Sequence, residues 1–243
     1  MRTVFLGTSK FAVAVLERLA QSDHAPLLVL TRPDRPRGRG RKLASPPVAE
    51  AARRLGIELA QPRSINDETA RALIAGRRPD AVCVSSFGAL IKEPLLSDYL
   101  MLNVHPSLLP RWRGAAPIER AIMAGDDRTG VSIMRVTAGL DSGPVYVQEA
   151  EAIDSSDTYG TLAARLKRLG GELLVRTLDE LPPSVEQDDS QATYAEKITA
   201  ADRRLDPAQP AAALEDSPYD RKGTGPGRGH ASGRDRHLCS PRR

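Results

Sequence analysis

A polar pair near the middle of the chain is the first candidate for chemistry. Asn103 and His105 are two positions apart, so on a β-strand both side chains project from one face while Val104 projects from the other. Pro106 lacks the N–H that a sheet ladder needs, so the strand should end there. An amide and an imidazole side by side at a strand end predict a site that binds a developing oxyanion.

An acidic residue between two glycines is the candidate third member of this site. Asp141 stands in the segment 139–143, which begins and ends with glycine and lies between two predicted strands. Glycine allows a loop to approach a ligand closely, so Asp141 can come near the strand end that carries His105. The alternative is structural, because Asn-x-His often occurs by chance and a turn aspartate often binds its own backbone. The local sequence leaves both readings open.

The residues that follow the pair form a mostly apolar loop. They are Ser107, Leu108, Leu109 and Pro110. Loops at the carboxyl ends of parallel strands are the usual ligand site of an α/β sheet. We therefore interpret this loop as the wall of a pocket, and a plain surface loop is the alternative interpretation.

A basic stretch, broken by proline and glycine, is the candidate nucleic-acid contact. Its cationic side chains include those of Arg35, Arg37, Arg39, Arg41 and Lys42. A long basic loop in a compact domain favours contact with phosphates over a merely solvated surface. The sequence lacks the glycine spacings of dinucleotide and P-loop sites, and it lacks any metal-ligand spacing. We therefore expect neither a nucleotide cofactor nor a metal.

Strand-like and helix-like segments alternate in the first half of the chain, as in a parallel α/β sheet. We expect strands at residues 3–7, 27–31, 57–60, 81–85, 101–105, 130–136 and 145–150. We expect helices at residues 11–20, 47–55, 67–75, 92–97, 117–124 and 158–181. Asn66 and Asp157 are the predicted caps of two of these helices. Residues 32–46 are predicted to lack regular structure, and residues 184–206 to be a polar connector.

The composition limits the class of protein. The chain has 243 residues and a net charge of +4. Aromatic residues make up only 4% of it, and this low content weakens any role as a stacking platform for single-stranded RNA. Since the sequence shows no signal-peptide pattern and no apolar stretch long enough for a bilayer, we expect a cytoplasmic protein without a membrane partner. Cys83 lies in an apolar run and is expected to be a buried free thiol.

Taken together, these motifs resemble the methionyl-tRNA formyltransferases, a branch of the folate-dependent formyltransferase family. The likeness covers roughly residues 1–214 and includes Asn103, His105, Asp141 and the loop after His105. The basic stretch and the segment 193–198 look like the family's insertion loop and interdomain linker. The Asn/His/Asp group is shared by all folate-dependent formyltransferases, whereas the basic loop and the linker indicate the branch that acts on tRNA.

The resemblance implies an α/β, Rossmann-like formyltransferase domain whose mostly parallel sheet is flanked by helices. It implies an enzyme that transfers a formyl group from 10-formyltetrahydrofolate to the free amino group of methionyl-initiator tRNA, for translation initiation. Asn103 and His105 would bind the oxyanion, with His105 alternatively a general acid. Asp141 would orient or charge His105 and help to remove a proton from the amine. We expect a monomer.

The same resemblance implies binding residues outside the Asn/His/Asp group. The residues expected to bind the folate are Ser107, Leu108, Leu109, Pro110, Phe87 and Gly88. The residues expected to bind tRNA are Arg35, Arg37, Arg39, Arg41 and Lys42.

The resemblance divides the chain into a catalytic domain at 1–187, a linker at 188–206, and a remnant with a disordered Gly/Pro/Arg-rich tail at 207–243. The family continues into a β-barrel that binds tRNA, whereas residues 215–243 have no strand pattern. We interpret the barrel as missing and the tail as the product of a frameshift or truncation. Two alternatives stay open: a formyltransferase for another amine, such as glycinamide ribonucleotide or an amino sugar, and a weakly active remnant that binds folate or RNA.

Overall fold

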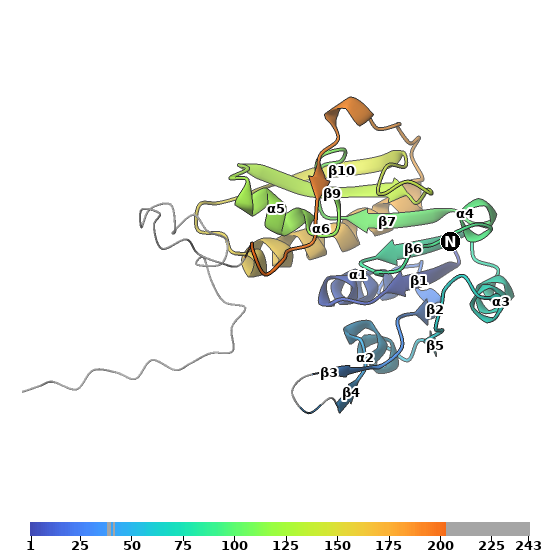
Figure 1. Cartoon of the computed structure of the whole chain (residues 1–243). Coiled ribbons are helices and arrows are strands. Elements are labelled where there is room, and N and C mark those ends of the chain that lie inside the picture. The colour runs from blue at the N-terminus through green and yellow to red at the C-terminus, as the bar shows by residue number, and fades with distance from the viewer. Residues whose placement is uncertain (38–39, 41, 203–243) are drawn as a thin grey trace, which may run out of the picture.

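The computed structural model describes residues 1–37, 40 and 42–202, which are built around a seven-stranded sheet. Its strands are β1 (Thr3–Gly7), β2 (Pro26–Leu30), β5 (Leu59–Ala60), β6 (Ala81–Ser85), β7 (Met101–His105), β9 (Arg128–Arg135) and β10 (Val145–Ala152). They lie in the order β10-β9-β7-β6-β1-β2-β5, where β9 runs antiparallel to both its neighbours, β7 and β10, and the strands from β7 to β5 pair in parallel (Figure 1). The parallel part has the strand order of a Rossmann-like fold, which confirms the predicted fold class.

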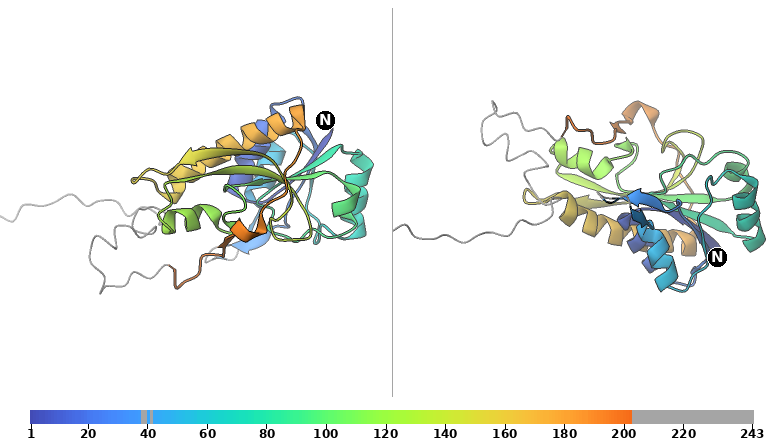
Figure 2. Two further views of the ribbon diagram at one scale, coloured as in Figure 1. Left: turned by 90° about the horizontal axis from the view of Figure 1, so that it is seen from above. Right: turned by 60° about the horizontal axis from the view of Figure 1, so that its bottom comes forward.

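Helices cover both faces of this sheet (Figure 2). They are α1 (Lys10–Ala20), α2 (Pro47–Arg54), α3 (Glu68–Arg77), α4 (Leu95–Asp98), α5 (Pro117–Met123) and α6 (Tyr159–Glu180), with a 3₁₀ turn η1 (Asp189–Gln191). Buried residues of α1, α2 and α6 join one hydrophobic cluster, and those of α3 and α4 join a second. No helix in the described part of the chain is long and apolar enough to cross a membrane.

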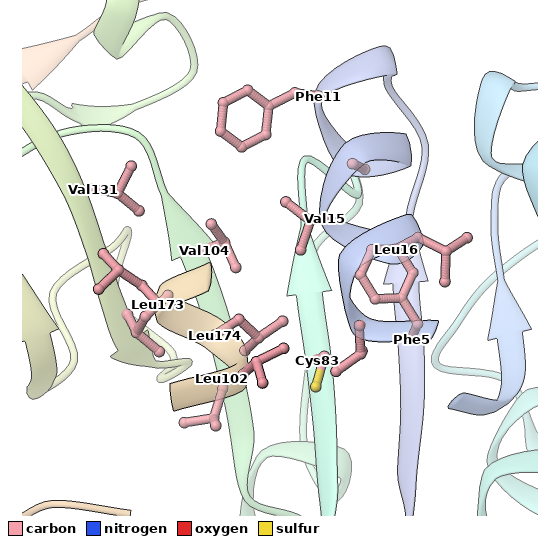
Figure 3. Packing of buried hydrophobic residues seen from close by; sticks show 14 of the residues in the cluster. Phe5, Phe11, Val15, Leu16, Cys83, Leu102, Val104, Val131, Leu173 and Leu174 are labelled. Atoms are coloured by element: carbon pink, nitrogen blue, oxygen red, sulfur yellow. The ribbon is translucent and has the colours of Figure 1, made fainter. Parts of the chain in front are cut away.

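Alternation along the central strands divides their side chains between the two clusters. On β7, Leu102 and Val104 point into the larger cluster, where they lie near Leu173 and Leu174 of α6 (Figure 3). Fully burying one such leucine contributes about 1.5–3 kcal/mol relative to exposure. Asn103 and His105 therefore face away from this core, as their spacing predicts.

Two glycines allow α6 to approach its neighbours closely. A Cβ at Gly170 would lie 2.7 Å from Cγ1 of Val104, and one at Gly171 would lie 2.8 Å from Cβ of Arg18 on α1. Neither distance leaves room for a side chain. The packing of α6 on β7, the strand that carries His105, therefore depends on Gly170, and the packing of α6 on α1 depends on Gly171.

The cap predicted for α3 is wrong by one residue. Asp67 accepts a hydrogen bond from the N–H of Ala70 and caps the helix, whereas Asn66 lies one residue earlier. The Asn66 amide instead donates to Leu90 O and accepts from the N–H of Lys92. Asn66 thus holds the loop after β6 rather than the helix.

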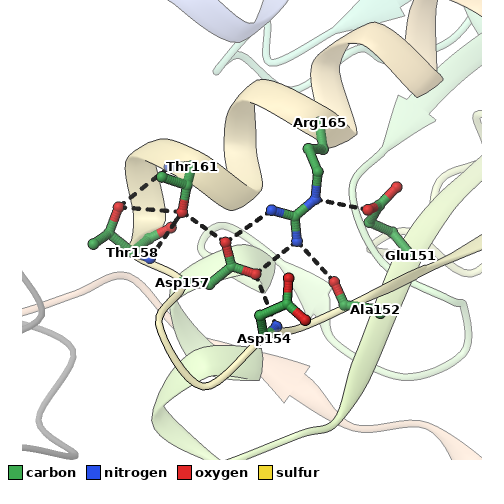
Figure 4. Close-up of polar contacts among 7 residues, drawn as sticks. All are labelled: Glu151, Ala152, Asp154, Asp157, Thr158, Thr161 and Arg165. Carbon is green, nitrogen blue, oxygen red and sulfur yellow. Dashed lines mark hydrogen bonds and ion pairs between the residues drawn. The ribbon is translucent and has the colours of Figure 1, made fainter.

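The cap predicted for α6 is also wrong by one residue. Thr158 caps the helix with its side chain, and Thr161 completes a capping box. Asp157 instead binds the Arg165 guanidinium through two bonds of 2.8 and 2.6 Å, and Arg165 also binds Glu151 on β10 (Figure 4). The Arg165 guanidinium holds the pKa of the Asp157 carboxyl well below its ordinary value. This network joins the start of α6 to the edge of the sheet.

One short strand pair contradicts the prediction that residues 32–46 lack regular structure, and a second involves the predicted connector. β3 (Arg35–Arg37) and β4 (Lys42–Ala44) form an antiparallel pair inside the stretch 32–46. β11 (Tyr194–Ala195) pairs in parallel with β8 (Arg113–Gly114), so the predicted connector contacts the catalytic part of the chain. The predictions for residues 203–243, including the missing barrel and the disordered tail, lie outside the described residues.

Candidate active site

His105 lies at the carboxyl end of β7, next to two neighbouring strands. Its position pairs with Ser132 of β9, and Asn103 pairs with Met134 of β9 and Val84 of β6. The imidazole is 4% exposed, and its Nε2 lies 2.9 Å from the carbonyl oxygen of Trp112. Because a carbonyl oxygen only accepts, Nε2 must carry the hydrogen of this bond. In the neutral ring, Nδ1 is then the nitrogen with the free lone pair.

The residue that supplies this carbonyl, Trp112, is held by three contacts. The N–H of Trp112 donates to Oγ1 of Thr193 at 2.9 Å, and its indole Nε1–H donates to Asp126 at 2.8 Å. The guanidinium of Arg111 covers the indole ring at 4.4 Å and also binds Asp126. Burial raises the pKa of the Asp126 carboxyl, but hydrogen bonds from Arg111 and Trp112 outweigh burial and lower it. The acceptor that selects the His105 tautomer is therefore rigidly positioned.

Asp141 completes the predicted group. Its Oδ2 lies 3.7 Å from Nδ1 of His105 and accepts a hydrogen bond from the N–H of Gly114 at 2.9 Å. Oδ1 has no hydrogen-bond partner among the described residues, so it can accept a proton from a ligand. The loop thus brings the carboxylate to the imidazole nitrogen that carries the lone pair.

Asn103 is the member whose side chain is free. The residue is partly buried, and its amide makes no hydrogen bond to any residue in the described parts of the chain. An amide has two N–H donors, and half-buried donors without partners are available to a bound oxygen. The arrangement combines a free donor, an imidazole with a defined tautomer and an adjacent carboxylate. Such a group can stabilise an oxyanion and move a proton.

The loop after His105 is anchored to β9 and β10. The fully buried Ser107 donates from Oγ to Arg111 O at 2.6 Å and accepts at its carbonyl from Ser132 Oγ. Gln148 of β10 donates to Leu109 O at 2.7 Å. Leu108 packs close to Gly130, where a Cβ would lie 2.6 Å from Leu108 Cδ2. The Ser107 side chain is therefore occupied by the protein itself.

A cavity of about 370 Å³ lies beside this loop. Leu109 and Pro110 line it together with residues 145–148 and 185–188. Asn103, His105 and Asp141 are not among its lining residues. The apolar loop therefore lines this cavity, as predicted for a pocket wall, without the three catalytic candidates.

The loop after β6 approaches the site from the neighbouring strand. Thr8 Oγ1 donates to the carbonyl oxygen of Phe87 at 2.8 Å, and Arg32 donates to that of Gly88 at 2.6 Å. Phe87 is 5% exposed, and Gly88 has a φ of 71° with open space where a Cβ would be. Among the described residues, the backbone N–H groups of residues 87–91 have no hydrogen-bond partner. The carbonyl groups of Phe87 and Gly88 are thus anchored, whereas the backbone N–H groups of this loop remain available to a ligand.

The basic hairpin β3–β4 extends from the sheet edge (Figure 1). The side chains of Arg35 and Lys42 belong to exposed residues. Arg39 and Arg41 lie outside the described residues, and Arg37 is described by its backbone in β3 alone. At the base of the hairpin, a hydrogen bond from Gln61 lowers the pKa of the Asp34 carboxyl.

The groups that hold the candidate residues could not be predicted from the sequence. They are the carbonyl of Trp112, the N–H of Gly114, the Arg113 side chain and the Gln187 amide, which donates to the Asp141 loop from 46 residues away. A residue pattern carries no information on which backbone groups will bind a side chain. Gln187 lies outside the motifs that indicate chemistry, and the role of Arg113 depends on its contact with Gln187.

The formyl transferase family model matches residues 1–178 of this chain. The methionyl-tRNA formyltransferase of Halorhodospira halophila is 44% identical over 221 residues, with 88% of this chain and 71% of that protein covered. The chain belongs to the formyl transferase family. The methionyl-tRNA formyltransferase of Methylococcus capsulatus is 45% identical over 213 residues, covering 85% and 69% of the two chains. The predicted family is confirmed, and the roles of single formyl transferase residues stay predictions.

Solved formyl transferases have the same fold. The phosphoribosylglycinamide formyltransferase from Bacillus halodurans has a TM-score of 0.61 and 25% identity, with 74% of this chain and 95% of that chain covered. An N-formyltransferase from Helicobacter canadensis, solved with folinic acid and dTDP-3-aminofucose, has a TM-score of 0.66 and 14% identity. That match covers 89% of this chain and 79% of that chain.

Proposed function

We propose that this chain transfers the formyl group of 10-formyltetrahydrofolate to the α-amino group of methionine on initiator tRNA. The observation that carries the acceptor is the level of sequence identity that is kept over most of the chain. Methionyl-tRNA formyltransferases match up to 89% of this chain at 42–45% identity, beyond the family match that ends at residue 178. The phosphoribosylglycinamide enzyme from Bacillus halodurans matches 74%. That enzyme is 25% identical, so the higher identity of the methionyl-tRNA formyltransferases favours the tRNA acceptor over glycinamide ribonucleotide.

The reaction forms one C–N bond and breaks another. The amine nitrogen attacks the formyl carbon, whose carbonyl electrons move to oxygen and give a tetrahedral oxyanion. The bond from that carbon to N10 of the folate then breaks, and N10 takes a proton while the amine loses one. Donors placed for the oxyanion lower the barrier, and one such donor is worth about 100- to 1000-fold in rate.

Asn103 and His105 serve this chemistry in different ways. The unpartnered Asn103 amide donates to the oxyanion. His105 Nε2 is held by Trp112 O at 2.9 Å, so Nδ1 is the atom that carries or delivers the proton. Oδ2 of Asp141 faces this Nδ1 at 3.7 Å, and its other oxygen accepts the proton of the attacking amine. Catalytic contacts of this length often shorten when a substrate binds.

The folate is assigned to the face between the loop after β6 and the candidate group. Phe87 and Gly88 belong to a loop with free N–H donors, and a pterin ring offers acceptors on its edge and a flat face for packing. Ser107, Leu108, Leu109 and Pro110 contribute by shaping the strand end, since Ser107 Oγ already binds Arg111 O. No residue in this proposal requires a metal.

Initiator tRNA is assigned to the basic hairpin. Arg35 and Lys42 are exposed and can contact phosphates, and the proposal extends to Arg37, Arg39 and Arg41 from the sequence. Arg32, at the base of the same stretch, binds Gly88 O at 2.6 Å. Arg32 therefore connects the base of the basic hairpin to the loop proposed for the folate.

A direct assay tests the proposal. The purified chain is given 10-formyltetrahydrofolate with methionyl-initiator tRNA, and formylmethionyl-tRNA is quantified. Parallel reactions contain glycinamide ribonucleotide or an amino sugar nucleotide, and His105→Ala is the inactive control. Formylation of the tRNA supports the proposal. Formylation of a small amine alone would reject it, and folate binding without any transfer would instead support the remnant.

A further inference from the structure

A strap formed by residues 184–195 crosses the loop that carries Asp141. At one end, Val145 and Val185 exchange two backbone hydrogen bonds, each 2.8 Å long. At the other end, β11 pairs with β8, and the N–H of Arg113 donates to Thr193 O at 2.9 Å. The strap is thus fixed on both sides of Gln187.

The Gln187 amide binds two carbonyls of the Asp141 loop. Its Nε2 donates to the carbonyl oxygen of Asp141 at 2.9 Å and to that of Gly143 at 2.7 Å. Both N–H groups of the amide are therefore used. Gly143 adds a steric restraint, because a Cβ there would lie 2.1 Å from Arg135 O.

Arg113 determines which way the Gln187 amide points. Its Nε and Nη2 donate to Gln187 Oε1 at 3.0 and 2.9 Å. A guanidinium has donors only, so the amide oxygen must face Arg113 and the amide nitrogen must face the loop. The Arg113 side chain is 3% exposed, and its other side-chain partner, Asp189, is 82% exposed. Gln187 is therefore the less exposed side-chain partner of a buried cation.

From these contacts we infer that Gln187, oriented by Arg113, is a positioning residue for Asp141. Asp141 has a φ of 47°, a left-handed conformation that a non-glycine residue keeps only when its surroundings impose it. Gln187 binds the carbonyl of this residue and so holds the carboxylate at its distance from His105. The expected effect on turnover rests on the proposed function, whereas the contact between Gln187 and the Asp141 loop does not.

The test replaces the donors while keeping the partner of Arg113. In Gln187→Glu, carboxylate oxygens still accept from Arg113 but can no longer donate to the Asp141 loop. Gln191→Glu is the matched control, since Gln191 is an exposed residue of the same strap whose amide, among the described residues, hydrogen-bonds only Ser190. Gln187→Met provides a second variant without added charge. Each full-length variant is measured by hydrogen exchange, with attention to residues 137–144, and by steady-state formyl transfer.

Both Gln187 variants should exchange several-fold faster at residues 137–144, with the rest of the chain unchanged. Their kcat should fall about 10- to 100-fold, because a displacement near 1 Å costs up to about 100-fold in rate. KM for 10-formyltetrahydrofolate should stay within about twofold, which a general loss of structure would not produce. Exchange and kcat equal to the Gln191→Glu control would overturn the inference, as would faster exchange throughout the chain. An inactive wild-type chain would reject the proposed function. The exchange data would still show whether Gln187 restrains the Asp141 loop.

Discussion

Replacing Asp141 by asparagine tests the charge at the candidate site with almost no change in shape. The Asn oxygen can still accept from the N–H of Gly114, which binds Asp141 Oδ2 at 2.9 Å. The negative charge that lies 3.7 Å from His105 Nδ1 is removed. Stability should therefore change by less than about 1.5 kcal/mol, the usual net contribution of one hydrogen bond. The rate should change much more.

The size of the rate effect follows from the geometry of the pair. Two unit charges 3.7 Å apart attract by about 4 kcal/mol at an effective dielectric constant near 20, and by about 1 kcal/mol in water. The side chains of His105 and Asp141 are 4% and 19% exposed, which favours the larger figure. Since about 1.4 kcal/mol corresponds to a factor of ten, kcat of Asp141→Asn should fall roughly 100- to 1000-fold.

The assay is single-turnover formylation of methionyl-initiator tRNA at saturating 10-formyltetrahydrofolate. Asp98→Asn, which removes an exposed carboxylate of α4, is the matched control and should keep the wild-type rate. Urea unfolding of both variants shows whether a slower rate reflects unfolding. If Asp141→Asn retains more than a tenth of the wild-type rate, the carboxylate does not act on a charged His105 and the proposed role is wrong.

Three further perturbations test the core, the α6 network and the basic hairpin. Leu102→Ala should lower the free energy of unfolding by about 2–5 kcal/mol, because Leu102 is fully buried; a decrease below about 1 kcal/mol in urea unfolding would contradict the packing. Because the Arg165 guanidinium lowers the pKa of the Asp157 carboxyl, this ion pair stabilises the fold at pH values above the ordinary carboxyl pKa, which is about 4. The stabilisation is lost progressively as the pH falls from there through the lowered pKa. Arg165→Met should therefore be destabilised at pH 7, and its difference from wild type should shrink progressively as the pH falls below about 4; a difference in thermal unfolding that does not shrink on acidification would refute this. Replacing Arg35 and Lys42 by Ala should reduce the salt slope of tRNA binding by about one for every phosphate that the variant no longer binds, and an unchanged slope in filter binding would exclude the hairpin.

The sequence predicts the central strands well because their apolar runs are buried on both faces. β1, β6 and β7 begin and end at the predicted residues. The two helix caps fail by one residue, since Asn66 and Asp67, or Asp157 and Thr158, are neighbouring cap formers. Which one caps depends on tertiary partners, such as Leu90 for Asn66.

The β3–β4 pair could not be predicted from the residue pattern for a different reason. Its strands lie in a segment of arginine, proline and glycine that has no apolar alternation, and Leu43 is 74% exposed. Hydrogen bonds across the pair, rather than a buried face, define it. Similarly, the spacing of Asn103 and His105 predicts a shared face, but only the fold brings Asp141 near His105 and Gln187 near Asp141.

Backbone strain marks the same region independently of side-chain chemistry. Five non-glycine residues in the described ranges have positive φ, and two of them, Arg78 and Leu181, are left-handed helix C-caps. The other three are Ser86, Trp112 and Asp141. Ser86 precedes the loop with free N–H groups, Trp112 supplies the acceptor of His105, and Asp141 is the carboxylate. Such conformations cost about 1–3 kcal/mol each and persist only where surrounding contacts impose them. Since the strain not explained by helix ends gathers around His105, the fold tolerates a lower stability in order to place groups at this site.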